Sequence, residues 1–160
     1  MSKREVPVRH VRAITPADTD LMLDLHLQVF GVKANRPLFA DAMFGECSRA
    51  YCLEEPNTKE LLGFVLCKLL GPVVCIDGIG VRPDVQRLRI GSDLLEHVIR
   101  KADIEEINVV TYLPACNVVA NAFFRSHGFQ CRLIERGRYR FGQENIDSFR
   151  FVRSIPEVPQ

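Results

Sequence analysis

The sequence lacks any long run of apolar residues and any strong excess of one charge. No segment approaches the roughly 20 apolar residues that cross a bilayer, and the opening MSKREVPVRH is too polar for a secretory signal. With 21 basic and 20 acidic residues, the formal net charge is +1, so no global field favours nucleic acid or an anionic membrane. We therefore expect a soluble protein of the cytoplasm or nucleus, without a membrane or nucleic-acid partner.

Cysteine pairs of the CxxC type are also missing. The six cysteines stand apart from one another and from the four histidines, so no metal site is expected. Cys67 and Cys75 fall in apolar, strand-like runs, which is typical of small core residues. Reduced thiols are expected, as in other cytosolic and nuclear proteins.

Two nucleotide-binding motifs are absent as well. No GxxxxGK[ST] loop occurs, and the segment GIGVRP lacks the third glycine of a dinucleotide fingerprint. These absences argue against a P-loop nucleotidase and against a Rossmann-type dehydrogenase.

What the sequence does contain is a succession of apolar strands and amphipathic helices. Apolar runs predict strands at 8–14, 49–55, 61–70, 73–81 and 107–113, then in QCRLIERGRYRF and IDSFRFV. Helical spacing and capping residues predict helices from Thr15 to 29, from about Pro37, over 91–102, and from Asn117 to about Ser126. We expect one α/β domain with a mixed sheet over residues 1–160 and a core at about 8–153.

The stretch PDVQRLRIGSDLLEHVIRKA (83–102) joins a short polar loop to an amphipathic helix. Free amides of such a loop and of the first helical turn point one way, and the helix dipole adds partial positive charge. Residues 86–92 can therefore hold a phosphate, and Arg87 and Arg89 would strengthen binding of a pyrophosphate. An ordinary turn with two solvated arginines is the alternative.

Asp77 is the one carboxylate inside an apolar strand, next to Gly78. We expect it to be buried, and a buried carboxylate in such a place suits a general base. The equal alternative is a carboxylate that only accepts a hydrogen bond from a neighbouring backbone amide.

Arginines recur at period two near the C-terminus. Arg136, Arg138 and Arg140 are expected to line one face of a strand. This face is either a solvated edge or a surface that binds a polyanion.

Two short motifs, correctly spaced, carry a resemblance. Residues 86–91, QRLRIG, match Gln/Arg-x-x-Gly-x-Gly/Ala except at Arg89, which replaces a glycine. Residues 117–129, NVVANAFFRSHGF, match Asn-x-x-Ala-x-x-Phe-Tyr-x-x-x-Gly-Phe except at Phe124, which replaces the tyrosine. Residues 8–153 thereby resemble the GNAT superfamily of N-acetyltransferases, a single α/β domain with a mixed, mostly antiparallel central sheet flanked by helices.

The resemblance implies acetyl-CoA as cosubstrate and no metal. Backbone groups of Ile79, Gly80 and Val81 would bind the thioester and the pantetheine arm. The pyrophosphate would lie against Gln86, Arg87, Leu88, Arg89, Ile90, Gly91 and Ser92, while Asn117 and Phe124 would line the far side of the channel. Because the donors are main-chain amides, Arg89 removes none of them. If its position requires a positive φ, arginine costs roughly 1 kcal/mol.

The same resemblance implies Asp77 as the base. The tyrosine that usually serves as the acid is replaced by Phe124, so Tyr112, five residues before Asn117, is the substitute; an equal alternative is that Tyr112 belongs only to the core.

The resemblance implies a primary amine as the acceptor. VFGVKANRPLFADAM and the two last strands resemble N-terminal protein acetyltransferases of the NatE type, which implies Val32 and Tyr139 at the acceptor site. An α-amine, with a pKa of about 8 against about 10.4 for lysine, needs a weaker base. A small amine (polyamine, aminosugar or antibiotic) and a CoA-binding interaction protein with little turnover remain alternatives, and the hairpin 131–153 is a candidate homodimer interface.

Overall fold

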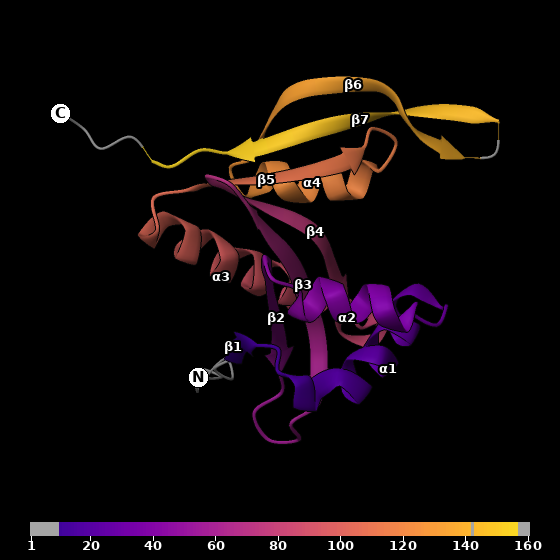
Figure 1. Ribbon diagram of the computed structural model, residues 1–160, viewed down its shortest axis with the longest axis vertical. Coiled ribbons are helices and arrows are strands. Elements are labelled where there is room, and N and C mark those ends of the chain that lie inside the picture. The colour runs from indigo at the N-terminus through magenta and orange to yellow at the C-terminus, as the bar shows by residue number, and fades with distance from the viewer. Residues whose placement is uncertain (1–9, 142, 157–160) are drawn as a thin grey trace, which may run out of the picture. The chain divides into compact units, whose positions relative to one another are not determined.

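The computed structural model describes residues 10–141 and 143–156. Its helices are α1 (Thr19–Phe30), α2 (Arg36–Phe44), α3 (Ile90–Ile104) and α4 (Val118–Ser126), with 3₁₀ turns η1 (Pro16–Asp18) and η2 (Pro83–Leu88). Its strands are β1 (His10–Ala13), β2 (Ser48–Glu54), β3 (Leu61–Leu70), β4 (Val73–Val81), β5 (Asn108–Pro114), β6 (Gln130–Phe141) and β7 (Glu144–Arg153) (Figure 1). Residues 8 and 9 of the expected first strand lie outside the described residues.

The strands form a seven-stranded sheet in the order β1-β2-β3-β4-β5-β7-β6. The β1–β2, β5–β7 and β6–β7 pairs are antiparallel, and β4–β5 is parallel. The expected α/β fold, with a mixed and mostly antiparallel sheet between helices, is confirmed.

The chain divides into two compact units. Unit 1 comprises the described residues of Met1–Leu66 and Gly78–His97, and unit 2 those of Cys67–Asp77 and Val98–Gln160. Strands β3 and β4 and helix α3 contribute residues to both units.

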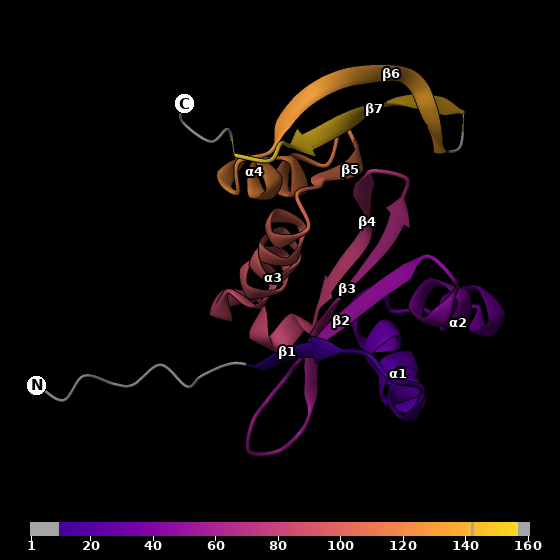
Figure 2. The same ribbon diagram turned by 60° about the vertical axis from the view of Figure 1, so that its left-hand side comes forward.

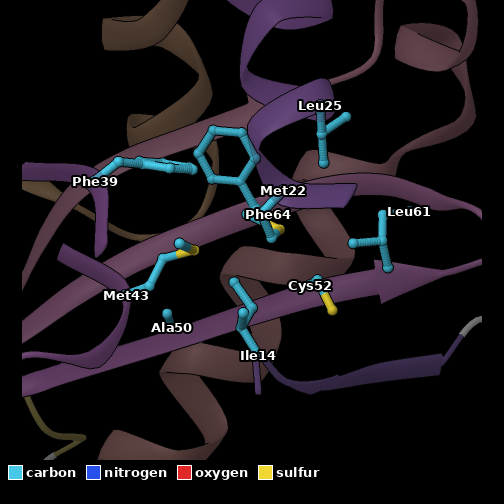
Figure 3. Close-up of a cluster of buried hydrophobic side chains, with 9 residues drawn as sticks. All are labelled: Ile14, Met22, Leu25, Phe39, Met43, Ala50, Cys52, Leu61 and Phe64. Carbon is cyan, nitrogen blue, oxygen red and sulfur yellow. The ribbon is translucent and has the colours of Figure 1, made fainter. Parts of the chain in front are cut away.

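Unit 1 has its core between α1, α2 and strands β2 and β3. Phe64, only 1% exposed, lies among side chains from both helices, as Figure 3 shows. The cluster consists of Ile14, Met22, Leu25, Phe39, Met43, Ala50, Cys52, Leu61 and Phe64. Both helices therefore present apolar faces to the same side of the strands.

A partly buried ion pair fixes the start of α1 in unit 1. The Arg12 guanidinium donates to both oxygens of Asp18, at 2.8 and 2.9 Å, and to Glu54 at 3.0 Å. Asp18 also accepts the Thr15 backbone N–H at 2.8 Å. The hydrogen bond from Arg12, more than any other contact, lowers the pKa of Asp18 from 3.8 to about 2.

The other face of unit 1 is covered by the first turns of α3 (Figure 2). A Cβ at Gly63 would lie 2.9 Å from the Ile90 side chain and 3.1 Å from Leu94, so this glycine lets the helix approach β3. A Cβ at Gly80 would lie 2.5 Å from the ring of Phe64. Gly80 of β4 therefore marks a close approach to the Phe64 ring of β3.

Unit 2 is built on β5, which pairs with β4 on one side and β7 on the other. Helix α4 runs beside β5 (Figure 1). The Arg125 guanidinium lies 5.0 Å from the centre of the buried Phe151 ring of β7. Arg153 pairs with Asp103 of α3 at 2.6 Å. No helix within the described residues is long and apolar enough to cross a membrane.

Candidate functional site

The turn between β4 and α3, in unit 1, has the geometry of an anion cradle. Arg89 separates η2 from α3 and adopts the left-handed conformation, with φ 61° and ψ 27°. Its carbonyl accepts the Asp93 N–H at 3.1 Å, so Arg89 provides the first hydrogen bond of α3. The amides of Ile90, Gly91 and Ser92 belong to the first turn, whose N–H groups have no intrahelical acceptor.

The sequence left open whether position 89 requires a positive φ. The structure shows that it does. A left-handed conformation strains an arginine by roughly 1 kcal/mol, because its Cβ crowds the following carbonyl group. The departure from the motif therefore strains the backbone and leaves the main-chain donors in place.

A buried side chain, a main-chain hydrogen bond and the salt bridge between Arg82 and Asp84 stabilise this turn. Ile90 is completely buried, and the Arg82 N–H donates to the carbonyl of Leu62 at 2.9 Å. The Arg82 guanidinium binds Asp84 at 2.6 and 3.0 Å and holds the pKa of that carboxyl below its usual range. Among the candidate cofactor residues of the turn, Gln86, Arg87, Leu88 and Arg89 are exposed, whereas Gly91 and Ser92 are half-buried.

The parallel pairing of β4 with β5 ends at one defined position. Ile76 is the last residue of β4 in register with β5, opposite Thr111. The Thr111 hydroxyl donates to the Ile76 carbonyl at 3.1 Å and closes the ladder there. Beyond this point, Ile79 and Val81 are half-buried and Gly80 is buried, and none of the three has a partner on β5 in the described register.

Asp77 and Tyr112 are the first residues beyond that last pair, and both belong to unit 2. Each comes two residues after a member of the Cys75–Val110 pair, so both side chains leave the same face of the strands. The register alone thus brings the proposed base and the proposed acid to neighbouring strands at one level.

The expectation that Asp77 is buried is wrong. Its side chain is 39% exposed, because the β5 pairing that covers the preceding residues stops at Ile76. The carboxylate lies 3.8 Å from the Nζ of Lys68, and the Cys75 thiol donates to it across 3.9 Å. Asp77 is therefore an accessible carboxylate with a lysine beside it.

Tyr112 is half-buried beneath an arginine. The Arg138 guanidinium lies 4.9 Å from the centre of the Tyr112 ring and also pairs with Glu135. Such stacking on an aromatic face is a favourable cation–π contact. It restrains the ring without using the phenol hydroxyl.

The expected period-two face of Arg136, Arg138 and Arg140 is interrupted. Glu135 lies opposite Ser148 and Tyr139 opposite Ile146, so 136–138 of β6 face the single residue Asp147 of β7. Gly137 supplies the turn with φ 65°, and its N–H donates to Asp147 at 2.9 Å. This irregularity breaks the regular alternation of side chains between the two faces of β6, and Arg138 lies over the Tyr112 ring as a result.

The candidate residues Asn117, which caps α4, and Phe124, within α4, already contact other residues of unit 2. The Asn117 side-chain oxygen accepts the Ala120 N–H at 3.1 Å, as expected for a helix cap. Phe124 is 5% exposed, and its ring centre lies 5.1 Å from Phe129 and 5.3 Å from Phe123. Phe124 thus presents very little surface to a ligand.

The two candidate acceptor residues differ in surroundings. Val32, in the loop between α1 and α2 of unit 1, is 61% exposed, and its carbonyl lies 3.1 Å from a ring nitrogen of His26. Tyr139 of unit 2 is half-buried on β6.

Sequence reasoning missed Lys68 and Arg138 as site residues. A signal for Lys68 existed, since it is the lone charge of the apolar strand LLGFVLCKLL, as Asp77 is of VVCIDGIGV. No local signal places Arg138 over Tyr112, because its direction depends on Asp147 of the neighbouring strand. Within residues 10–141 and 143–156, no group of three or more metal-ligating side chains could hold a metal ion.

Comparison with known structures finds the same fold in several acetyltransferases. The ribosomal-protein-S18-alanine N-acetyltransferase of Escherichia coli superposes with a TM-score of 0.80 at 22% identity, covering 94% of this chain and 97% of that one. NAA60 of Arabidopsis thaliana in complex with a bisubstrate analogue gives 0.77 at 21%, covering 92% and 98%. Ard1 of Thermoplasma volcanium gives 0.74 at 16%, covering 93% and 99%. No curated protein sequence matches the chain.

The family comparison settles the resemblance. Residues 19–129, which include both motifs, match the model of the Acetyltransferase (GNAT) family. The motif positions Arg89 and Phe124 depart from the family pattern, but the fold around them is retained. The chain therefore belongs to the GNAT family of acetyltransferases.

Proposed function

We propose that this protein transfers the acetyl group of acetyl-CoA to the α-amine at the N-terminus of a polypeptide. The observation that carries the proposal is the turn η2–Arg89–α3, whose left-handed residue turns the chain into a helix with a free first turn. A polypeptide acceptor is supported by the similar structures, one of which is named for an alanine of a ribosomal protein.

The cosubstrate would be held chiefly by main-chain groups. Amides between Arg87 and Ser92 would bind the pyrophosphate, where the α3 dipole favours negative charge. Backbone groups of residues 79–81, which have no register with β5, would bind the pantetheine arm and the thioester. Asn117 has its side-chain oxygen in the helix cap, so its Nδ2 hydrogens are the ones left for a ligand.

Two side chains of unit 2 would move the protons. Acetyl-CoA supplies an activated acyl group as a thioester. The acceptor nitrogen forms a bond to the acyl carbon and the carbon–sulfur bond breaks, while Asp77 takes the proton of the amine directly or through water. Tyr112 donates its phenol proton to the departing sulfur. Lys68, 3.8 Å from Asp77, would orient that carboxylate toward the acceptor.

The test is an acetylation assay on a panel of amines, read by mass spectrometry and by released CoA. We expect modification of peptides with a free N-terminus and none of the same peptides when the N-terminus is blocked and only a lysine is free. Asp77→Asn should lower kcat about 10- to 100-fold. Asp24→Asn, at an exposed position of α1, is the matched control and should be neutral. Acetylation confined to lysine or to a polyamine would overturn the α-amine assignment.

A further inference from the structure

Positive charge is concentrated on one strand of the molecule. Strand β6 carries four arginines and one glutamate, a net charge of +3, whereas the whole chain carries +1, so the remainder is net −2. A chain that is nearly neutral overall thus has one strongly basic element.

Most of this charge is uncompensated. Arg132, Arg136 and Arg140 are exposed, and within the described part of the chain no ion pair neutralises them. Two of the three nearby carboxylates are engaged, since Glu135 pairs with Arg138 and Asp147 accepts the Gly137 N–H at 2.9 Å. The third, Glu144 of β7, lies opposite Phe141, so three exposed arginines face one exposed carboxylate. An anion that reaches β6 would therefore meet guanidinium groups with free donors.

The basic strand is also an edge. β6 is the last strand in the order of the sheet, beside β7, and no other strand of residues 10–141 and 143–156 lies beyond it (Figure 2). An edge strand offers main-chain N–H and C=O groups to an extended peptide. Through Arg138, 4.9 Å from the Tyr112 ring, the same strand contacts the residue assigned to proton donation.

We propose that β6 binds an acidic stretch of the acceptor polypeptide downstream of its N-terminus. This inference rests on the proposed function and names the acceptor class. The arginines would pair with carboxylates while the strand edge aligns the peptide backbone. A peptide fits better than RNA because the basic charge is confined to one strand edge and the rest of the chain is net negative, which disfavours a long polyanion.

The test uses three short fluorescent peptides with the same first residues, followed by acidic, neutral or basic residues. Binding is measured by anisotropy without acetyl-CoA, and kcat/KM is measured separately with it. The acidic peptide should bind about tenfold tighter than the neutral one at low salt, and the preference should shrink as salt is added. R136E/R140E should abolish it, and the milder R136Q/R140Q should weaken it.

The matched control is K59E/R100E, which changes the net charge equally at two exposed positions that are not part of β6. It should leave the acidic preference intact. Equal binding of the three peptides, or equal loss in the control, overturns the inference, as does RNA that binds more tightly with the same dependence on Arg136 and Arg140. If the acidic peptide binds but is not acetylated, the proposed function is wrong and this inference stands. If the peptides are acetylated with no preference for the acidic one, this inference is wrong and the proposed function stands.

Discussion

Two segments of this molecule depart from the family pattern, and the departures differ in kind. At the turn before α3, Arg89 replaces a glycine, but the backbone still adopts φ 61°. On α4, Phe124 replaces a tyrosine, and a hydroxyl is lost from a side chain that is 5% exposed.

The two departures differ because the turn before α3 would bind through main-chain groups, whereas the tyrosine of the family motif acts through a side-chain hydroxyl. A cradle of main-chain amides depends on conformation, so a side-chain replacement there costs strain and leaves the donors unchanged. A proton donor depends on one side-chain atom, so in the proposed mechanism another residue takes over the role of the lost hydroxyl. Tyr112 is in the right register to do so.

The largest effect is expected from Tyr112→Phe, which would remove the proposed proton donor. The kcat should fall about 100- to 1,000-fold, with little change in acetyl-CoA affinity. The ring and its contact with Arg138 are retained, so thermal unfolding should be unchanged within error. A rate close to wild type would mean that solvent protonates the thiolate.

Next comes Gly80→Ala, which tests how strictly unit 1 depends on backbone shape. The new Cβ would lie 2.5 Å from the core ring of Phe64, and the free energy of unfolding should fall by about 2–3 kcal/mol. Gly78→Ala is the matched control, because no atom lies within 4 Å of its Cβ. Urea midpoints measure both, and equal losses would contradict the close-approach account.

The ion pair of Asp18, which has no part in the proposed mechanism, makes the stability of the fold depend on pH. The Asp18 pKa is about 2 in the folded state against 3.8 for a free group, so the ionised form stabilises folding above pH 3.8. That contribution, about 2 kcal/mol, should be lost as the pH falls toward 2. Urea unfolding from pH 5 to pH 2 should show this loss in the wild type and a flatter profile in Asp18→Asn.

Phe124→Tyr asks whether the family hydroxyl can be restored. The added group would enter a buried aromatic cluster, so we expect a loss of about 1–2 kcal/mol in unfolding free energy and no gain in kcat. Denaturation and rate measurements on the same preparation decide the matter. A tenfold faster enzyme would show that the position still faces the reaction.

Arg89→Gly should have the smallest effect. Relief of the left-handed strain should raise the free energy of unfolding by about 1 kcal/mol. Part of this gain is lost because glycine gives the unfolded chain more conformational entropy. Calorimetric titration with acetyl-CoA should give a Kd within about threefold of wild type, since the amides are unchanged. Binding by the variant alone would mean that arginine disables the cradle.

Much of this fold follows from local signals. Strands β3 and β4 begin and end where the apolar runs do, and the apolar face of the amphipathic helix α3 is buried at Leu94, Leu95, Val98, Ile99 and Ala102. The Asn117 cap likewise follows from a residue type and its spacing. Such features depend on neighbours along the chain, which the sequence displays directly.

The remaining features depend on contacts between strands. The exposure of Asp77 follows from where β5 stops pairing, which no pattern within β4 reveals. Arg138 reaches Tyr112 because Gly137 and Asp147 reset the register of two strands. The period-two expectation failed there, since alternation holds only for an uninterrupted ladder.

Cys75, beneath Asp77, bears on the selectivity of acyl transfer. In an enzyme whose substrate is a thioester, a nearby thiolate would compete with the amine and leave the protein itself acylated. Burial raises the pKa of the Cys75 thiol to about 11, and the Asp77 charge adds to this. At pH 7 roughly one such thiol in ten thousand is ionised, and the thiolate is the reactive form. The packing that fills the core therefore also spares the protein from modifying itself.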